Sequence, residues 1–163
     1  MSESPPLKAS SRRVDEALAA LGVDYEIRNH ESSARSAEEA AATVGCPVGQ
    51  IVKSLIFRGT ESDRTVLAVA SGGNRVNEKA LAALLGEKIQ RADADFVRRQ
   101  TGYAIGGVPP LAHVHEPVVF IDRDLMAYDT VWAAAGTPNS VVRLKTADLE
   151  RITAGQIADI KKL

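Results

Sequence analysis

The sequence predicts an α+β domain built around a mixed, curled β-sheet, and two observations lead to this prediction. About seven segments have the apolar pattern of strands, and about five or six place apolar residues at helical spacing. Several neighbouring strands are separated by short turns, as in hairpins, rather than by the helices of strict βαβ alternation. The 163 residues show no repeat and no linker. We therefore expect one domain over residues 10–163, preceded by a frayed tail over residues 1–9.

The first third of the chain is expected to contain two helices and one strand. Residues 10–21 carry apolar side chains at helical intervals, and Gly22 is placed to end that helix. Residues 23–29 alternate between apolar and polar side chains, as a half-buried strand does. A capping box at residues 36–39 then opens an alanine-rich helix, which we expect to end at Gly45.

Residues 48–58 form a strongly β-prone segment that a charged residue interrupts. The β-branched and aromatic side chains of this segment favour a central strand, which residues 59–64 connect to a returning strand at residues 65–70. Lys53 stands among apolar residues, so its ammonium group must either extend to solvent or point into a cavity that holds a negative group. The residues alone leave both alternatives open.

A glycine-rich loop at residues 71–75 follows this hairpin and leads into a helix between Asn77 and Gly86. Glycines at the entry of a helix can bind phosphate. The spacing here matches neither the dinucleotide-binding pattern nor the phosphate-binding loop pattern, so the sequence assigns this loop no ligand.

The second half of the chain is expected to continue with short strands and helices. One helix is opened by either Asp93 or Asp95 and closed by Gly102. A capping box at residues 153–156 is expected to open a last helix that ends at residues 161–162. The remaining strands are expected at residues 88–91, 118–122, 130–135 and 140–144, and one helical turn at residues 124–128.

The loop that follows Gly102 combines flexible and rigid backbone. Gly106 and Gly107 admit conformations closed to other residues and leave no side chain between the backbone amides and a ligand. Pro109 and Pro110 then fix the chain direction. Such a preformed loop can hold a carbonyl or phosphate oxygen through its backbone N–H groups. An ordinary Gly-Pro turn between two elements is the alternative interpretation.

The composition excludes several classes of protein. A formal net charge of −1 argues against a general nucleic-acid binder, so any contact with nucleic acid is expected to be local. The single cysteine, Cys46, excludes an internal disulfide and is expected to be a small core residue. No signal peptide and no run of 18 apolar residues is present, so we expect a cytoplasmic protein with no membrane contact.

The usual catalytic sets are missing from the sequence. His113 and His115 lack a third ligand at helical spacing and are expected in a surface turn, and His30 ends a strand. No serine or cysteine has a clear histidine and carboxylate pairing. We therefore expect no metal and no cofactor, and an enzyme on this chain would depend on positioning and backbone donors.

Several motifs together resemble the YbaK/ProX-type family of aminoacyl-tRNA deacylases, whose domain is also inserted in bacterial prolyl-tRNA synthetases as an editing module. The resemblance covers about residues 10 to 160. The motifs that carry it are, in chain order, His30, Ala37-Glu38-Glu39-Ala40-Ala41, Lys53 in an apolar strand, Ala92-Asp93, Thr101-Gly102-Tyr103, Gly106-Gly107-Val108-Pro109-Pro110, Phe120-Ile121-Asp122, Gly136 and Thr146-Ala147-Asp148-Leu149.

The resemblance implies a fold, an activity and a set of site residues. The fold is a mixed, partly closed β-barrel-like sheet surrounded by helices. The activity is hydrolysis of the ester that joins a wrong amino acid to tRNA, typically tRNA for proline. A hydroxyl of the terminal adenosine, rather than a protein base, helps to activate water. The 3′ end of aminoacyl-tRNA is the implied ligand, and prolyl-tRNA synthetase is a candidate partner.

The residues that match the family motifs receive their roles by the same resemblance. Lys53, with Gly106 and Gly107, is implied to be catalytic: the lysine holds the tRNA 3′ end, and the loop amides hold the aminoacyl carbonyl and the terminal ribose. The implied substrate-binding residues are His30, Val108, Pro109, Pro110, Ala134 and Gly136.

Two departures from the family bear on specificity and activity. Ala112 stands where many members have glycine, and Ala133-Ala134-Ala135 stands where many carry a serine or histidine. The alanines suggest a pocket that selects small side chains such as alanine, serine or 2-aminobutyrate by size, and size selects weakly. A pocket without polar anchors also leaves open a non-catalytic module that binds tRNA or a synthetase.

Overall fold

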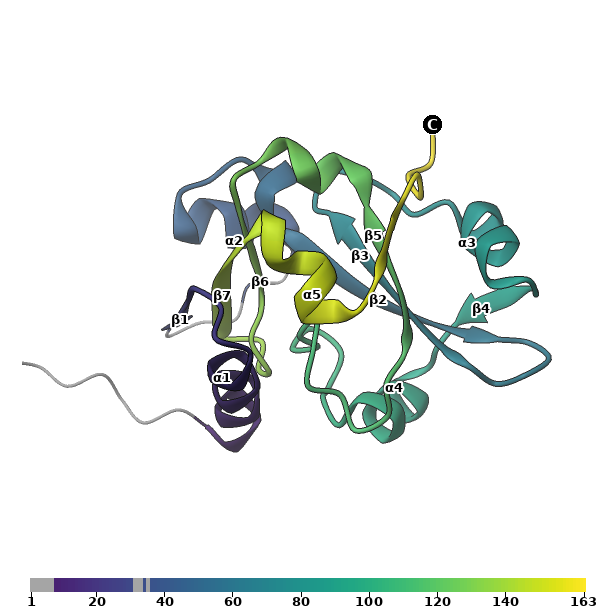
Figure 1. Cartoon of the computed structure of the whole chain (residues 1–163), viewed down its shortest axis with the longest axis horizontal. Helices are drawn as coiled ribbons and strands as arrows, with labels where there is room; N and C mark the ends of the chain where they lie inside the picture. The colour runs from purple at the N-terminus through teal and green to yellow at the C-terminus, as the bar shows by residue number, and fades with distance from the viewer. Residues whose placement is uncertain (1–7, 31–33, 35) are drawn as a thin grey trace, which may run out of the picture.

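The computed structural model describes residues 8–30, 34 and 36–163. Residues 1–7 of the expected tail lie outside the described part of the chain. The tail was predicted to reach residue 9, but the first helix, α1 (Ala9–Leu21), already begins there. Figure 1 shows α1 beside the strands β1, β6 and β7 on one side of the molecule, and α3 with β4 on the other.

The strands form two sheets, which confirms an α+β fold with mixed strand pairing. The smaller sheet is antiparallel throughout, with the order β1 (Tyr25–Asn29), β7 (Ser140–Lys145), β6 (Thr130–Ala134). The larger sheet has the order β4 (Ile89–Arg91), β2 (Val52–Gly59), β3 (Thr65–Ser71), β5 (Val118–Asp122), β8 (Gln156–Ala158). In it β4, β2 and β3 are antiparallel, whereas β3, β5 and β8 run parallel.

The two sheets meet at the start of β2. Ile51 forms a parallel bridge with Trp132 of β6, and β4 pairs with the far end of β2, at Phe57–Gly59. Between these two contacts, the edge of β2 faces the loop of residues 105–108 instead of a strand. Cavities lie between this part of β2 and that loop. This incomplete pairing is where the fold leaves room for a ligand.

Helix ends follow the capping signals in the sequence. The remaining helices are α2 (Ala37–Val44), α3 (Glu78–Leu85), α4 (Ala94–Thr101) and α5 (Leu149–Thr153). The side chains of Ser36, Asn77 and Asp93 each accept a hydrogen bond from a backbone N–H in the first turn of α2, α3 and α4. Asp93, not Asp95, is therefore the cap of α4. The predicted terminating glycines Gly22, Gly45, Gly86 and Gly102 all adopt left-handed conformations.

The prediction for the C-terminus was wrong. Residues 153–156 do not open a helix: Thr153 ends α5, and its hydroxyl donates to the carbonyl of Leu149. Residues 156–158 form β8, which pairs with β5. The capping-box spacing misled because the short segment that follows it gains more from pairing with a buried strand than from an isolated helical turn.

Other elements also differ from the sequence-based expectations in type or bounds. The segment at residues 48–58 begins with a 3-10 turn, η1 (Val48–Gln50), before β2 starts at Val52. The helical turn expected at residues 124–128 is a 3-10 turn, η2 (Arg123–Ala127), and a further 3-10 turn, η3 (Thr146–Asp148), precedes α5. With β8, the described residues contain eight strands rather than about seven.

The main core lies between the two sheets. Its buried side chains come from α1, α4, α5 and both sheets, and include Leu18, Val69, Phe96, Ile121, Val142 and Leu149. A second cluster beneath α3 includes Phe57, Val66 and Leu81. Cys46 is half-buried against a third cluster that contains Trp132, and burial raises the pKa of its thiol. Among the described residues, no helix has the length and apolar character needed to cross a membrane.

Candidate active site

A cavity of about 310 Å³ lies at the start of β2, where the two sheets meet. Its walls are mostly apolar and come from segments far apart in the sequence. Five segments contribute to these walls: Ser36 and Ala37 at the start of α2, Lys53 and Ser54 of β2, Ile105, Gly106 and Val108 of the loop after α4, Ala133 and Ala134 of β6, and Ser140 of β7.

Lys53 supplies the positive charge of this cavity. Its side chain is half-buried, and its ammonium group donates a hydrogen bond to the backbone carbonyl of Asn74. Burial lowers the pKa of Lys53 below its ordinary value, while the nearby carboxylates of Glu38 and Asp122 oppose that shift. Of the two alternatives that the sequence left open, the structure shows Lys53 lining a cavity. An ammonium group among apolar walls is suited to hold a negatively charged or carbonyl oxygen.

The loop of residues 102–113 presents Gly106 to the cavity and buries Gly107. Gly106 lines the cavity with φ +92°, and among the described residues its N–H has no hydrogen-bond acceptor. The N–H of Gly107 is already used, because it donates to the carbonyl of Ala104 at 3.0 Å. Gly107 also packs so closely that a Cβ atom there would lie 2.9 Å from Cα of Thr137. The two glycines therefore serve different needs.

Two aromatic side chains hold this loop in shape. The hydroxyl of Tyr103 donates to the carbonyl of Ala112 at 2.8 Å, and Nε2 of His113 donates to the carbonyl of Pro109 at 2.6 Å. Sequence reasoning placed His113 in a surface turn, but its ring is largely buried, whereas His115 is exposed. Ala112 has φ +64°, a left-handed conformation that glycine adopts more readily than alanine.

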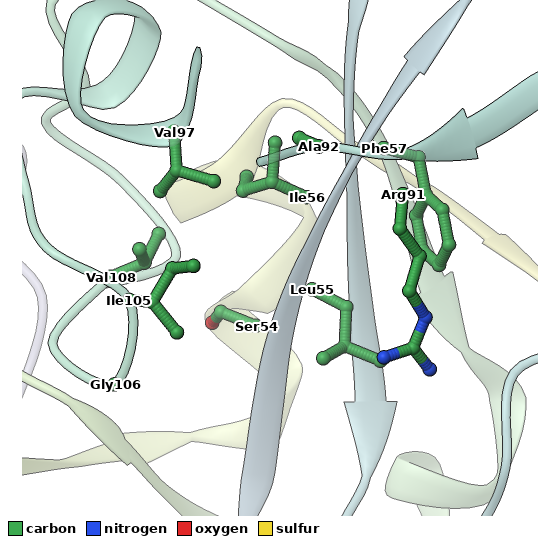
Figure 2. Close-up of a pocket in the computed structure, with 10 residues that line it drawn as sticks. All are labelled: Ser54, Leu55, Ile56, Phe57, Arg91, Ala92, Val97, Ile105, Gly106 and Val108. Carbon is green, nitrogen blue, oxygen red and sulfur yellow. The ribbon is translucent and has the colours of Figure 1, made fainter. Parts of the chain in front are cut away.

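A smaller cavity of about 120 Å³ is lined by the same loop and lies toward the C-terminal half of β2 (Figure 2). It shares Ser54, Leu55, Ile105, Gly106 and Val108 with the larger cavity. Its remaining walls are mainly apolar and come from Ile56, Phe57, Arg91, Ala92 and Val97. The two cavities therefore adjoin each other at the loop and at the middle of β2.

Ser54 is a site residue that sequence reasoning missed. Figure 2 shows its side chain pointing from β2 toward Ile105 and Gly106. Its hydroxyl is buried and has no hydrogen-bond partner among the described residues. Buried hydroxyl groups are normally paired, so an unpaired one beside a cavity calls for an explanation. The signal in the sequence was a second polar residue directly after Lys53 in an apolar strand.

The structure brings some of the sequence-predicted site residues together and leaves others behind the cavity wall. Lys53, Gly106, Val108 and Ala134 all line the larger cavity. The others do not line it among the described residues: His30, Gly107, Pro109, Pro110 and Gly136.

Those five residues lie where they can support the site instead. Gly107, Pro109 and Pro110 are buried within the loop. The N–H of His30 donates to the carbonyl of Asn139 at 2.8 Å, which ties β1 to the turn before β7. A Cβ atom on Gly136 would lie 2.7 Å from the carbonyl oxygen of Ser10, so this glycine permits close packing against α1.

Comparison with known proteins relates this chain to a family. Residues 31–152 match the model of the aminoacyl-tRNA editing domain. Protein YwhH of Bacillus subtilis (strain 168) is 34% identical over 134 residues, which cover 82% of this chain and 85% of YwhH. The multifunctional Ser/Thr-tRNA deacylase ProXp-y of Escherichia coli (strain K12) is 25% identical over 171 residues, which cover 99% of each chain.

A solved structure is similar to this chain over nearly its full length. A crystal structure whose description proposes a trans-editing enzyme for prolyl-tRNA synthetase superimposes with a TM-score of 0.90 at 40% identity, covering 97% of this chain and 100% of that chain. At this level of identity the likeness concerns sequence as well as fold. The chain belongs to the aminoacyl-tRNA editing domain family, and it is an enzyme of the aminoacyl-tRNA deacylase class.

Proposed function

We propose that this chain is a trans-editing hydrolase that cleaves the ester of mischarged tRNA for proline carrying a small amino acid such as alanine, serine or 2-aminobutyrate. The observation that carries the proposal is the placement of Lys53 and Gly106 in the walls of one largely apolar cavity. A cation and a free backbone N–H there can receive the two kinds of oxygen that an aminoacyl ester on a nucleotide presents.

In the proposed mechanism Lys53 holds a phosphate or backbone oxygen of the tRNA 3′ end, and the N–H of Gly106 donates a hydrogen bond to the ester carbonyl oxygen. A backbone donor of this kind stabilises the negative charge that develops on the oxygen during attack by water. Gly107, whose own N–H is used by Ala104, contributes by allowing the loop to pack against Thr137. We assign both glycines to the same catalytic loop.

The base that activates water comes from the substrate in this proposal. Among the described lining residues of the larger cavity, none is an aspartate, a glutamate or a histidine. A hydroxyl of the terminal adenosine is therefore proposed to orient the attacking water. The protein's contribution is then positioning and charge stabilisation, which can supply a large part of a rate enhancement without a protein base.

The side chain of the amino acid is proposed to be selected by size. In the larger cavity, Ala134 and Val108 contribute small and apolar surface. The adjoining cavity of about 120 Å³ is too confined for a nucleotide, but it suits a small side chain. One methylene in such a pocket changes binding by only about 1–3 kcal/mol. We therefore expect activity on several small amino acids rather than on one.

The remaining assignments complete the proposed enzyme. His30, Pro109, Pro110 and Gly136 are proposed to support the substrate site through the turns that they hold, as described above. The partner is the 3′ end of aminoacyl-tRNA, with prolyl-tRNA synthetase as a second candidate partner. Because aminoacyl-tRNA is made and used in the cytoplasm, we propose that the enzyme acts there.

The decisive experiment measures release of amino acid from a panel of mischarged tRNAs for proline, with Lys53→Ala as the matched variant. We expect the wild type to hydrolyse small aliphatic and hydroxylated aminoacyl esters, and Lys53→Ala to lose about 100-fold or more in kcat/KM. Circular dichroism and thermal unfolding should show that the variant is folded. Faster hydrolysis of cysteinyl-tRNA than of every small ester would contradict the proposed specificity. Binding of tRNA without release of amino acid would favour a non-catalytic binding module instead.

A further inference from the structure

The glycine-rich loop of residues 71–75, to which the sequence assigned no ligand, lies directly against Lys53. The ammonium group of Lys53 donates to the backbone carbonyl of Asn74, the fourth residue of this loop. The N–H of Gly72 donates to the carbonyl of Ile51 at 2.7 Å, just before β2 begins. A Cβ atom on Gly72 would lie 2.4 Å from the carbonyl oxygen of Val48, so only glycine allows this contact.

A buried carboxylate at the end of β5 holds the loop. Asp122 is 2% exposed and forms no direct ion pair among the described residues, although the charges of Lys53 and Lys161 are near enough to interact with it. It instead accepts three hydrogen bonds: from the N–H of Ser71 at 3.0 Å, from the side-chain amide of Asn74 at 2.9 Å and from the N–H of Asp124 at 3.0 Å. A carboxylate in this environment remains in place only because such donors satisfy it.

Asn74 connects this carboxylate to Lys53. Its side-chain nitrogen donates to Asp122 and also to Asp124 at 2.9 Å, and the carboxylate of Asp124 is paired with Lys161 at 3.0 Å. These bonds fix the peptide of Asn74, whose carbonyl is the acceptor for the Lys53 ammonium. A lysine ammonium has three donors, so the bond to Asn74 leaves the others for substrate oxygens.

We propose that Asp122 and Asn74 are positioning residues for Lys53: the buried carboxylate fixes the glycine-rich loop, and the loop holds the ammonium group at the cavity before substrate arrives. The proposal rests on the role given above to Lys53. A lysine side chain is long and flexible, and ordering it during binding would cost affinity. Holding it in advance removes that cost, so the network should act on substrate binding through Lys53 and through no other group.

The test is a double-mutant cycle on binding. The ligand is a tRNA for proline whose alanine is joined by a stable amide in place of the ester, so that no hydrolysis occurs. Asn74→Ala and Asp122→Asn are each measured alone and combined with Lys53→Ala, and Arg123→Gln serves as the control because it removes an exposed ion pair with Asp159 that lies outside this network. Steady-state kcat and KM on the ester substrate and thermal unfolding are measured for the same proteins.

We expect Asn74→Ala and Asp122→Asn to weaken binding about tenfold and to raise KM more than they lower kcat, with little effect of Arg123→Gln. In the Lys53→Ala background the same two changes should weaken binding less than about twofold, because the group that they position is gone. A stability change alone would not produce this coupling. Asn74→Ala removes no buried charge, so it keeps the test available if Asp122→Asn does not fold.

Effects of Asn74→Ala that add to those of Lys53→Ala would overturn the positioning role and leave the proposed deacylase intact. Binding equal to wild type in Asn74→Ala would do the same. A Lys53→Ala variant that binds and hydrolyses like the wild type would instead contradict the proposed function itself, and the positioning role would fall with it. The single Lys53→Ala measurement therefore separates the two failures.

Discussion

Gly106 and Gly107 show that adjacent glycines in one loop can be required for different reasons. At Gly106 the requirement is conformational, since φ is +92° while a Cβ atom would meet only Cγ of Pro138 at 3.9 Å. At Gly107 the requirement is space, because a Cβ atom would lie 2.9 Å from the backbone of Thr137. Steric conflict with backbone cannot be relieved by rotating a side chain.

These two causes predict different costs of substitution. Gly106→Ala should lower the free energy of unfolding by about 1–2 kcal/mol, the ordinary cost of a left-handed residue. Gly107→Ala should lower the free energy of unfolding by more than Gly106→Ala does, because the turn at Thr137 must move. Urea unfolding of both variants measures the difference. Equal losses, or a larger loss at Gly106, would contradict the packing found at Gly107.

His113 predicts an acid-sensitive loop. Burial lowers the pKa of His113 in the folded protein below the ordinary 6.5, only partly offset by the bond to Pro109, and its Nδ1 is buried without a partner. The unfolded chain therefore takes up a proton at a higher pH than the folded protein does. The free energy of unfolding should decrease as pH falls below about 6.5 and should stop decreasing once pH is below the folded-state pKa.

The measurement is urea unfolding between about pH 7.5 and about pH 5.5, with His113→Gln and His115→Gln as a matched pair. His113→Gln should lose part of the pH dependence. His115→Gln, which changes an exposed ring, should retain it. An unchanged pH dependence in His113→Gln would show that the buried ring is not its source.

At the scale of an element, the start of α4 determines how one wall of the smaller cavity is held. The sequence allowed either Asp93 or Asp95 as its cap, and in the structure the carboxylate of Asp93 accepts from the N–H of Phe96 at 2.8 Å. Val97, in the next position, lines the cavity, and Phe96 is buried in the core. The cap therefore supports both the core and the site.

This geometry predicts unequal effects of two neighbouring aspartates. Asp93→Ala should reduce the free energy of unfolding by about 1 kcal/mol, because it leaves a backbone N–H of the first turn without its acceptor. Asp95→Ala removes only the favourable interaction of a charge with the helix dipole, so its effect should be a few tenths of a kcal/mol. Urea titration of the two variants distinguishes them, and a larger loss in Asp95→Ala would contradict the assigned cap.

At the scale of the whole molecule, a chain of net charge −1 must bind a polyanion through local charge. Arg75 and Arg91 are close enough to Lys53 for their charges to lower its pKa. Both side chains are exposed, and neither has a carboxylate partner among the described residues. Together with Lys53 they form a basic patch beside the cavities, in a molecule whose net charge is −1.

This patch predicts how salt affects tRNA binding. Each of Arg75→Ala and Arg91→Ala should weaken binding and reduce the slope of log affinity against log salt concentration by about 1, as expected for the loss of one phosphate contact. Arg123→Ala is the control, because Arg123 is exposed but paired with Asp159. Titrations of labelled tRNA at several salt concentrations measure the slopes. A slope unchanged in both variants would exclude these residues from the phosphate contacts.

The elements that the sequence predicted well are those specified by local chemistry. Helix α3 has its cap at Asn77 and its terminating glycine at Gly86 as expected, and β5 has the predicted bounds, because caps, glycines and apolar runs act within a few residues. The C-terminal segment failed for the opposite reason. Whether residues 156–158 become helix or strand depends on β5, which lies far away in the sequence and offers an unpaired edge.

By itself the sequence determined the α+β class, most of the elements and the loop at Gly106, and it predicted a site that includes Lys53. Only the tertiary structure decided which of these residues share a cavity, since β2, β6, α2 and the loop after α4 converge through packing that no local pattern encodes. It also decided that the N–H of Gly107 is used internally, that Ser54 has a buried unpaired hydroxyl, and that Asn74 and Asp122 reach Lys53. Helix caps and turns depend on neighbours in the chain, whereas a site depends on neighbours in space.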